Sequence, residues 1–158
     1  MQFPSKFLRQ IYFALADSNL NYCITSWGNV SKSTLQPLIY LQNKMIRLID
    51  KNPNITTLEK YKKLDILPLQ QMYHYRLLCK YYFCPDYRIT LQRNRTTRAA
   101  HTAEFIVKQV FTRYGERCRS HSVPKILNNL TLTQQNLTSY SEVKNKLRKY
   151  LLESMTTL

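Results

Sequence analysis

The sequence STLQPLIYLQNKMIRLI at residues 33–49 decides the fold of this chain. Its apolar positions recur every three or four residues, which is the period of one face of an α-helix. The residues of this stripe are Leu35, Leu38, Ile39, Gln42, Met45, Ile46 and Ile49. Ser33 is the predicted N-cap, and Pro37 is tolerated because it would then fall in the first turn. The prediction is a helix that buries one face.

Helical patterns continue on both sides of this segment. They are marked by Leu8, Ile11, Tyr12 and Leu15, by Leu69, Met72, Tyr73, Leu77 and Tyr81, and by Val143, Leu147, Tyr150 and Leu151. Thr56 followed by Glu59, and Ser139 followed by Glu142, have the spacing of a capping box, in which each side chain bonds the other residue's backbone N–H. Each pair is expected to begin a helix, the first of which ends at Lys63.

Three stretches are less regular. Pro124 is expected to begin a short helix over residues 123–130, because proline suits the first helical position. Residues 20–28 fit either a helix or an extended segment. Residues 105–111 are rich enough in β-branched and aromatic residues for a strand, although a helix is also possible.

Glycine is scarce, with Gly28 and Gly115 as its two occurrences, which disfavours tight hairpins and nucleotide-binding loops. The expected fold class is mainly α: a small multi-helix bundle with a basic loop and a short C-terminal mixed segment. The expected domains are a helical domain at 1–85, a basic linker or loop at 86–101, and a C-terminal tail subdomain at 102–158 that packs on the first.

The charge balance indicates a binder of polyanions. The chain of 158 residues carries 24 Lys and Arg against nine Asp and Glu, for a net charge of +15. Hydrophobic residues make up 44% of it, which is enough to form a core and is unlike a disordered basic tail. The favoured partner of such a folded, basic chain is nucleic acid.

Three groups of cations are the predicted contacts with nucleic-acid phosphates. The residues are Lys44, Arg47 and Lys51; Arg88, Arg93, Arg95 and Arg98; and Lys108, Arg113, Arg117 and Arg119. Binding through phosphates is independent of sequence and sensitive to salt. The alternative is that these charges only solvate the surface. Tyr75, Tyr82 and Tyr87 are candidates for stacking on bases, with packing over a core as their alternative.

Enzyme chemistry is not expected, and neither is a cofactor. The carboxylates are scattered, whereas two-metal phosphoryl transfer needs them close together. Cys79, Cys84, Cys118 and His121 could supply four zinc ligands, but their spacing is unusual for a zinc knuckle. Free or buried cysteines beside a surface histidine are the favoured interpretation, so no metal site is predicted.

The expected setting is the cytoplasm or the nucleus. The apolar runs are too short to cross a bilayer, and no signal peptide opens the sequence, so a membrane is not an expected partner. Without a targeting segment, cysteines are expected to be free thiols in a reducing compartment.

Six short motifs follow one another in a recognisable order. The first runs from Leu8 through Tyr12-Phe13 and Ser18-Asn-Leu-Asn-Tyr22 to Trp27-Gly28. The others are Leu41–Arg47, Leu64–Leu69 with Met72-Tyr73, Arg113–Ser120, Val123–Asn128 and Val143–Leu151. In this order they resemble the region that follows the palm in the reverse transcriptases of non-LTR (LINE-type) retrotransposons. The resemblance covers residues 8–152.

This resemblance implies the thumb and post-thumb tail of such an enzyme, which grip a primer–template duplex, without the carboxylate-bearing palm. The implied partners are RNA, DNA or an RNA–DNA hybrid, together with a reverse transcriptase palm or another protein. Two positions depart from the family's pattern. Cys23 stands where the family prefers glycine, and Ile126-Leu127 replaces an expected aromatic residue.

Two alternative interpretations stay open. The chain could be a docking fragment whose apolar face normally packs on the polymerase palm, which predicts an exposed apolar surface that drives association. It could also be a functionless retroelement remnant, which predicts poor folding in isolation.

Overall fold

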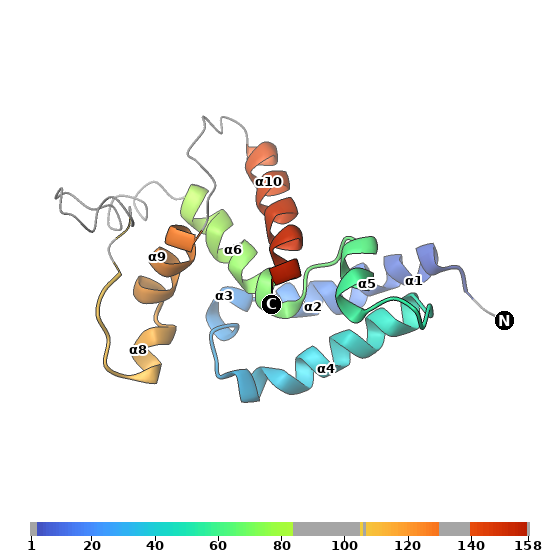
Figure 1. Cartoon of the computed structure of the whole chain (residues 1–158), viewed down its shortest axis with the longest axis horizontal. Helices are drawn as coiled ribbons and strands as arrows, with labels where there is room; N and C mark the ends of the chain where they lie inside the picture. The colour runs from blue at the N-terminus through green and yellow to red at the C-terminus, as the bar shows by residue number, and fades with distance from the viewer. Residues whose placement is uncertain (1–2, 84–104, 106, 130–139, 158) are drawn as a thin grey trace. The chain divides into compact units, whose positions relative to one another are not determined.

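The computed structural model describes residues 3–83, 105, 107–129 and 140–157. Every regular element in these ranges is helical, which confirms the predicted mainly-α class (Figure 1). The elements are α1 (Ser5–Ile11), η1 (Tyr12–Asp17), α2 (Ser18–Asn21), α3 (Ile24–Trp27), α4 (Lys32–Ile49), α5 (Thr57–Lys63), α6 (Leu69–Phe83), α8 (Arg113–Arg117), α9 (Arg119–Asn129), α10 (Tyr140–Glu153) and η3 (Ser154–Thr157). No helix in the described ranges is long and apolar enough to cross a membrane.

The chain packs as two compact units. Unit 1 comprises Met1–Tyr73 and Arg148–Leu158, and unit 2 comprises His74–Leu147. Helices α6 and α10 therefore each contribute to both units. These limits differ from the boundaries expected from composition, since the end of the chain packs with its beginning. The expected linker at 86–101 lies outside the described residues.

The N-terminal helix is continuous through α1, η1 and α2, and its middle part is π-helical. Tyr12 is buried on its inner face, with Leu8 and Ala16 packed against the same core cluster. Ile11 and Leu15 were predicted to share this face, but they are exposed. The prediction was wrong for these two residues because the core contacts of this helix come from Leu8, Tyr12, Phe13 and Ala16.

Helix α4 begins two residues earlier than the sequence indicated. Ser31, in an extended conformation, is the N-cap, and its hydroxyl accepts a hydrogen bond from the backbone N–H of Thr34 at 3.3 Å. The predicted N-cap, Ser33, lies inside the helix. Pro37 consequently falls in the second turn and cannot donate to the carbonyl of Ser33. Pro37 is on the exposed side, where water can satisfy that carbonyl.

The predicted apolar stripe of α4 contains a polar hub, Gln42, which is 1% exposed. Its amide nitrogen donates to the Tyr12 hydroxyl at 2.9 Å and to the carbonyl of Leu67 at 3.1 Å. Its amide oxygen accepts from the backbone N–H of Leu69 at 2.9 Å. Burial raises the pKa of Tyr12 to about 12, although the bond from Gln42 acts in the opposite direction. One side chain thereby ties the N-terminal helix and the start of α6 to α4.

Two local backbone requirements surround α3. Cys23, its N-cap, has a left-handed conformation with φ 48° and ψ 26°, which favours glycine. At Gly28, an added Cβ would lie 2.6 Å from the carbonyl oxygen of Ile24 and 2.7 Å from the ring of Tyr73. The open question over residues 20–28 is therefore answered by a short helix between a left-handed residue and a close-packed glycine.

In unit 2, the segment before α8 is held by side chains of α9. The backbone N–H of Phe105 donates to Asn128 Oδ1 at 3.0 Å, and Asn128 Nδ2 donates to the carbonyl of Phe105 at 3.1 Å. Residues 107–110 are neither strand nor helix. The Asn128 side chain thereby satisfies both backbone polar groups of Phe105. Helix α9 begins at Arg119, so Pro124 lies inside it instead of beginning it.

The remaining helix predictions agree with the structure where it describes them. Thr56 and Glu59 form both bonds of a capping box, and α5 ends at Lys63 as expected. The predicted inward residues of α6 are all buried, as are Val143, Leu147 and Leu151 in α10, whereas Tyr150, also predicted to face inward, is half-buried. Ser139, the other predicted cap, lies outside the described residues.

Candidate nucleic-acid interface

The carboxylates of unit 1 are all engaged inside that unit. Asp17 accepts from Asn21, Asp50 from Lys63 and Asn52, and Glu59 from Thr56, while Asp65 pairs with Arg9 and Arg148, and Glu153 with Lys149. Within the described ranges, no group of three or more His, Cys, Asp or Glu could hold a metal ion.

Several of these bonds stabilise helix ends. Lys60 is 6% exposed, and its ammonium group donates to the carbonyl of Asp50, the C-cap of α4, at 2.8 Å. Lys63 Nζ lies 2.8 Å from the Asp50 carboxylate. This bond, followed by one from the backbone of Asn52, lowers the pKa of Asp50. Both lysines are therefore structural cations.

The first predicted cation group lies on and just beyond α4. Lys44 and Arg47 are exposed on successive turns, but the helix ends at Ile49 and Lys51 follows it. Lys51 therefore does not share the helix face of Lys44 and Arg47, because Asp50 adopts an extended conformation and ends the helix before it. Arg47 donates to the hydroxyl of Thr57 at 3.2 and 3.3 Å, and this neutral partner leaves its charge uncompensated.

The third predicted group surrounds α8 in unit 2. Lys108 and Arg113 are exposed and Arg117 is half-buried. Between them lie Phe111 and Tyr114, which at 89% and 80% are the most exposed of the large hydrophobic side chains described. Arg119, the remaining member, is the first residue of α9. Cations interleaved with open aromatic faces can bind phosphates and stack on bases.

Local contacts give this group its form. The Thr112 hydroxyl accepts from the backbone N–H of Gly115 at 3.0 Å and begins α8. A Cβ at Gly115 would lie 3.0 Å from Val110 Cβ, so glycine allows the helix to fold back on the preceding segment. His121 Nδ1 lies 2.9 Å from the carbonyl oxygen of Lys108, which fixes the start of that segment to α9.

Comparison of the chain with known protein families, curated proteins and solved structures gives no match.

The second predicted cation group, Arg88, Arg93, Arg95 and Arg98, lies outside the described residues.

The predicted stacking residues differ from the aromatics that the fold exposes. Tyr75 is half-buried and bonds the thiol of Cys79, and Tyr82 packs edge-on against Tyr81 at 5.4 Å. Tyr87 lies outside the described residues. Sequence reasoning missed Tyr40, Phe111 and Tyr114, which are 64%, 89% and 80% exposed. The sequence could have identified Tyr40 as exposed, because this residue does not belong to the buried stripe of α4.

The four candidate zinc ligands are not brought together where the structure describes them. Cys79 is in the core of unit 2, where burial raises the pKa of its thiol and disfavours the thiolate that binds zinc. Cys118 is an exposed free thiol. His121 already uses Nδ1 against the carbonyl of Lys108. Cys84 lies outside the described residues.

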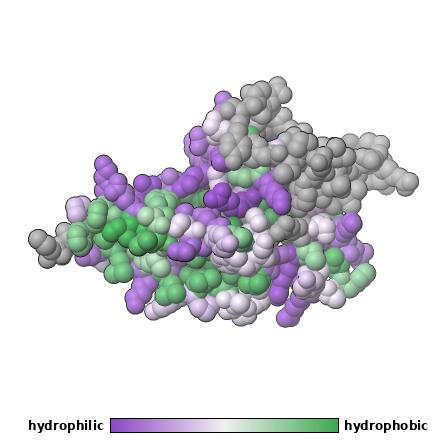
Figure 2. Space-filling view, turned by 180° about the vertical axis from the view of Figure 1, so that it is seen from behind, coloured by the Kyte–Doolittle hydropathy of each residue, from purple (hydrophilic) through white to green (hydrophobic). Residues whose placement is uncertain are grey.

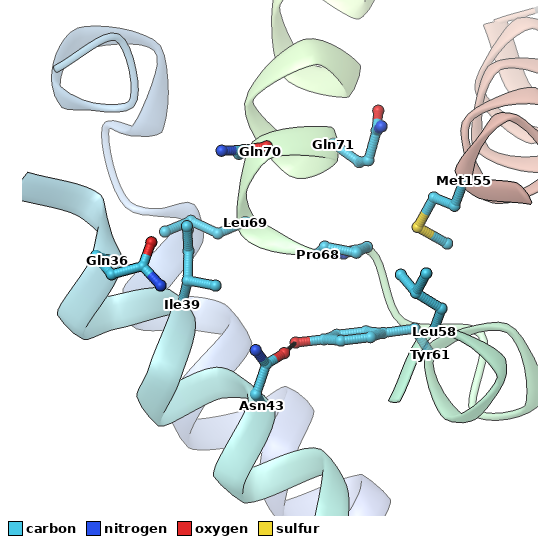
Figure 3. A pocket seen from close by; sticks show the side chains of 10 residues that line it. All are labelled: Gln36, Ile39, Asn43, Leu58, Tyr61, Pro68, Leu69, Gln70, Gln71 and Met155. Carbon is cyan, nitrogen blue, oxygen red and sulfur yellow. Dashed lines mark hydrogen bonds between the residues drawn. The ribbon is translucent and has the colours of Figure 1, made fainter. Parts of the chain in front are cut away.

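Unit 1 also contains a cavity of about 280 Å³ (Figure 3). It is lined by Gln36, Ile39 and Asn43 of α4, Leu58 and Tyr61 of α5, Pro68 to Gln71 at the start of α6, and Met155. Tyr61 donates its hydroxyl proton to Asn43 Oδ1 at 2.8 Å across one wall. The described lining has amides and apolar groups without a charge, so the cavity is unsuited to a phosphate or a metal ion.

Proposed function

We propose that this chain is a non-catalytic module that binds the phosphate backbone of RNA, DNA or an RNA–DNA hybrid without reading its sequence. The observation that carries the proposal is the basic and aromatic group of Lys108, Phe111, Arg113, Tyr114 and Arg117. Its cations make no ion pair with any described residue, and its aromatic rings face solvent. Such a surface supplies charge for phosphates and flat faces for bases.

The distribution of charge over the whole chain supports this proposal. Unit 2 contains 13 of the 24 Lys and Arg but four of the nine acids, a net charge of +9 over His74–Leu147. In unit 1 the carboxylates are engaged, while Lys32, Lys44 and Lys51 are exposed and form no ion pair with the described residues. An uncompensated positive surface attracts polyanions over a distance of the order of the Debye length.

Two backbone features support the similarity to the thumb and post-thumb region of a non-LTR retrotransposon reverse transcriptase. Cys23, at the position where that pattern prefers glycine, has the left-handed conformation that glycine favours. Gly28, in the Trp-Gly pair, occupies a position without room for a Cβ. The backbone suits glycine at both positions, although residue 23 of this chain is a cysteine. On this proposal the module grips a primer–template duplex and contributes no catalytic group.

The test is fluorescence anisotropy with a labelled RNA–DNA hybrid and a hybrid of scrambled sequence, each measured over a salt series. We expect equal affinities that fall steeply with salt, because each phosphate contact releases counterions. Absence of binding at low salt by folded protein would refute the proposal. Unequal affinities for the two sequences would contradict the proposal that binding is independent of nucleic-acid sequence.

A pair of matched variants locates the contact. Reversing Lys108 and Arg113 to Glu should weaken binding about tenfold or more and reduce the salt slope by about 2. The control reverses Lys125 and Lys146, which are exposed lysines of the same unit with the same change in net charge. Equal losses in both variants would assign binding to overall charge instead of this group. Reversal of Arg93, Arg95 and Arg98 tests the second predicted group in the same assay.

A further inference from the structure

The N-terminal helix is apolar on two faces. Leu8 and Tyr12 line the core of unit 1, whereas Phe3, Phe7, Ile11 and Leu15 point away from it, with exposures of 62%, 46%, 39% and 64%. We call these last four residues the outer stripe. Hydrophobic surface gathers beside the N-terminal end of the described chain (Figure 2). A helix that is apolar on both faces is typical of one that is covered on both.

The residues of the outer stripe are four apart in the sequence: Phe7, Ile11 and Leu15 lie in the helix, and Phe3 lies two residues before the helix begins at Ser5. The rings of Phe3 and Phe7 are already in contact, with centroids 5.4 Å apart. With side-chain areas of about 150–200 Å² each, the exposed fractions amount to roughly 400 Å². A patch of this size is comparable to the largest apolar patch on an ordinary monomeric protein, and such patches are often functional.

Polar groups next to the outer stripe are satisfied within the helix. Ser18 Oγ donates to the carbonyl of Ala14 at 2.7 Å, and Asn19 Nδ2 donates to the carbonyl of Leu15 at 2.6 Å. Side-chain donors thereby supply hydrogen bonds beside the π-helical segment. Covering this surface would remove little hydrogen bonding to water, which lowers the cost of burying it.

The charge around the outer stripe favours an apolar partner over nucleic acid. Residues 10–31 contain no Lys or Arg, although the chain has 24, and their one charged residue is Asp17. Two cations lie within the span of the stripe: Lys6 is exposed, and Arg9 pairs with Asp65. The positions that follow Lys6 at intervals of four residues are Gln10, Ala14 and Ser18. This near-neutral surface fits an apolar polypeptide surface and gives little local repulsion against a copy of itself.

We propose that the outer stripe binds the outer stripe of a second copy of this chain, with the two helices antiparallel. In that arrangement Phe3 and Phe7 meet Leu15 and Ile11, and each Lys6 lies beside the neutral end of the other helix. A parallel pair would instead place the two Lys6 side chains together. Two-fold pairing buries about 800 Å² in total, which corresponds to a weak, transient dimer. This inference is independent of the proposed nucleic-acid binding.

Sedimentation equilibrium of the full chain from micromolar to near-millimolar concentration tests the proposal. We expect a monomer–dimer equilibrium that tightens as salt is added, because salt screens the repulsion between two copies of net charge +15. Nucleic-acid binding has the opposite dependence on salt, so the two proposals can fail separately. A chain that stays monomeric throughout, or that forms larger assemblies without a dimer, would overturn this one.

The matched variants are Leu15→Glu and Leu48→Glu, which add the same charge at exposed leucines of similar exposure, 64% and 58%. Leu15→Glu should abolish dimerisation, and Leu48→Glu, on α4, should leave it intact. Unfolding midpoints near that of the parent would show that both variants fold. Dimerisation of Leu15→Glu with the parent affinity, or equal loss in both variants, would assign any association to another surface.

Orientation is tested by disulfide formation between chains, in a background with Cys23, Cys84 and Cys118 changed to serine. Mixing Phe3→Cys chains with Leu15→Cys chains should give the mixed disulfide faster than either homodimeric one. Faster homodimeric cross-linking would contradict the antiparallel arrangement.

Discussion

Units 1 and 2 are both basic, but they use their cations differently. In unit 1, Arg9 and Arg148 converge on Asp65, and Lys60 and Lys63 bind the end of α4 through Asp50. In unit 2, the described cations around α8 form no ion pair with described residues and lie among exposed aromatic rings. The comparison teaches that net charge alone does not indicate a binding surface. What matters is how many cations remain after the carboxylates have been paired.

The turn at Asp65 illustrates how unit 1 uses its arginines. Asp65 has a left-handed conformation with φ 52°, which Asp tolerates better than most residues. Arg9 Nε donates to the carbonyl of Leu64 at 2.6 Å, and Arg148 Nε to the Asp65 carboxylate at 3.1 Å. Two helices far apart in sequence thus hold one turn between α5 and α6.

The largest effect should come from Gln42, because unit 1 depends on directed polar contacts. Gln42→Leu keeps the volume but leaves the Tyr12 hydroxyl, the Leu67 carbonyl and the Leu69 N–H without this partner. We expect a loss of about 3 kcal/mol or more in the free energy of unfolding. Gln36→Leu on the exposed side of α4 is the control and should change it by less than about 0.5 kcal/mol. Equal effects in denaturant titrations would contradict the role of Gln42 as a hub.

Substitution of the exposed aromatic residues of unit 2 should affect binding and leave stability nearly unchanged. Phe111→Ala and Tyr114→Ala should leave the free energy of unfolding within about 0.5 kcal/mol, because both side chains are exposed. If they stack on bases, each should weaken binding to a strand with unpaired bases by about 1–3 kcal/mol. Anisotropy with an overhang and with a blunt duplex separates stacking from phosphate contact. Unchanged affinity for both would leave the cations alone as the contact.

Asp50 should make unit 1 sensitive to acid. Its pKa is below the ordinary value of 3.8, chiefly because of the bond from Lys63. The carboxylate therefore contributes stability that is present above the unfolded-state pKa and is lost as the pH falls through the lower folded-state pKa. Asp50→Asn should cost about 1 kcal/mol at neutral pH and much less in strong acid. Urea titrations over a pH series measure this difference, and parallel stability curves would contradict it.

The smallest expected effect is an increase in the free energy of unfolding. Cys23→Gly removes the Cβ that disfavours the left-handed conformation, at the cost of more freedom in the unfolded chain. The net result should be a stabilisation of about 0.5–1 kcal/mol. Cys118→Gly, at an exposed cysteine with φ −60°, is the control and should not stabilise. A thermal midpoint of Cys23→Gly at or below that of the parent would show that the thiol makes a compensating contact.

Sequence periodicity predicted the helices best where one face is buried along its whole length. Every predicted core residue of α6 is buried, since its apolar residues keep a helical spacing from Leu69 to Tyr81. Leu78 and Cys79 are buried as well and were not predicted. The same reasoning failed at Ile11 and Leu15, where apolar residues occur on both faces of one helix. Periodicity cannot tell a buried face from an exposed face when both are apolar. The N-cap of α4 was misplaced for a related reason, because Ser31 and Ser33 are equivalent candidates in sequence.

The candidate interface was predicted in part. Lys108, Arg113 and Arg117 were identified from charge, and the structure places them beside Phe111 and Tyr114. The stacking candidates were chosen because they fall off a helical stripe, yet Tyr75 and Tyr82 are engaged within unit 2. Exposure of an aromatic ring depends on which side chains pack over it, and these come from other parts of the chain.

By itself, the sequence determined the helical class, the capping box at Thr56 and Glu59, and the excess of positive charge. These depend on composition and on residues within one or two helical turns, which is the range that sequence spacing describes. The tertiary structure alone decided that Gln42 is a hub, that Lys60 is buried while Lys44 is exposed, and that the outer stripe faces solvent. The first two depend on partners 10 to 30 residues away in the sequence, and the exposure of the outer stripe depends on the absence of described residues that pack over it. Burial is a property of the packed chain, so sequence spacing alone does not determine it.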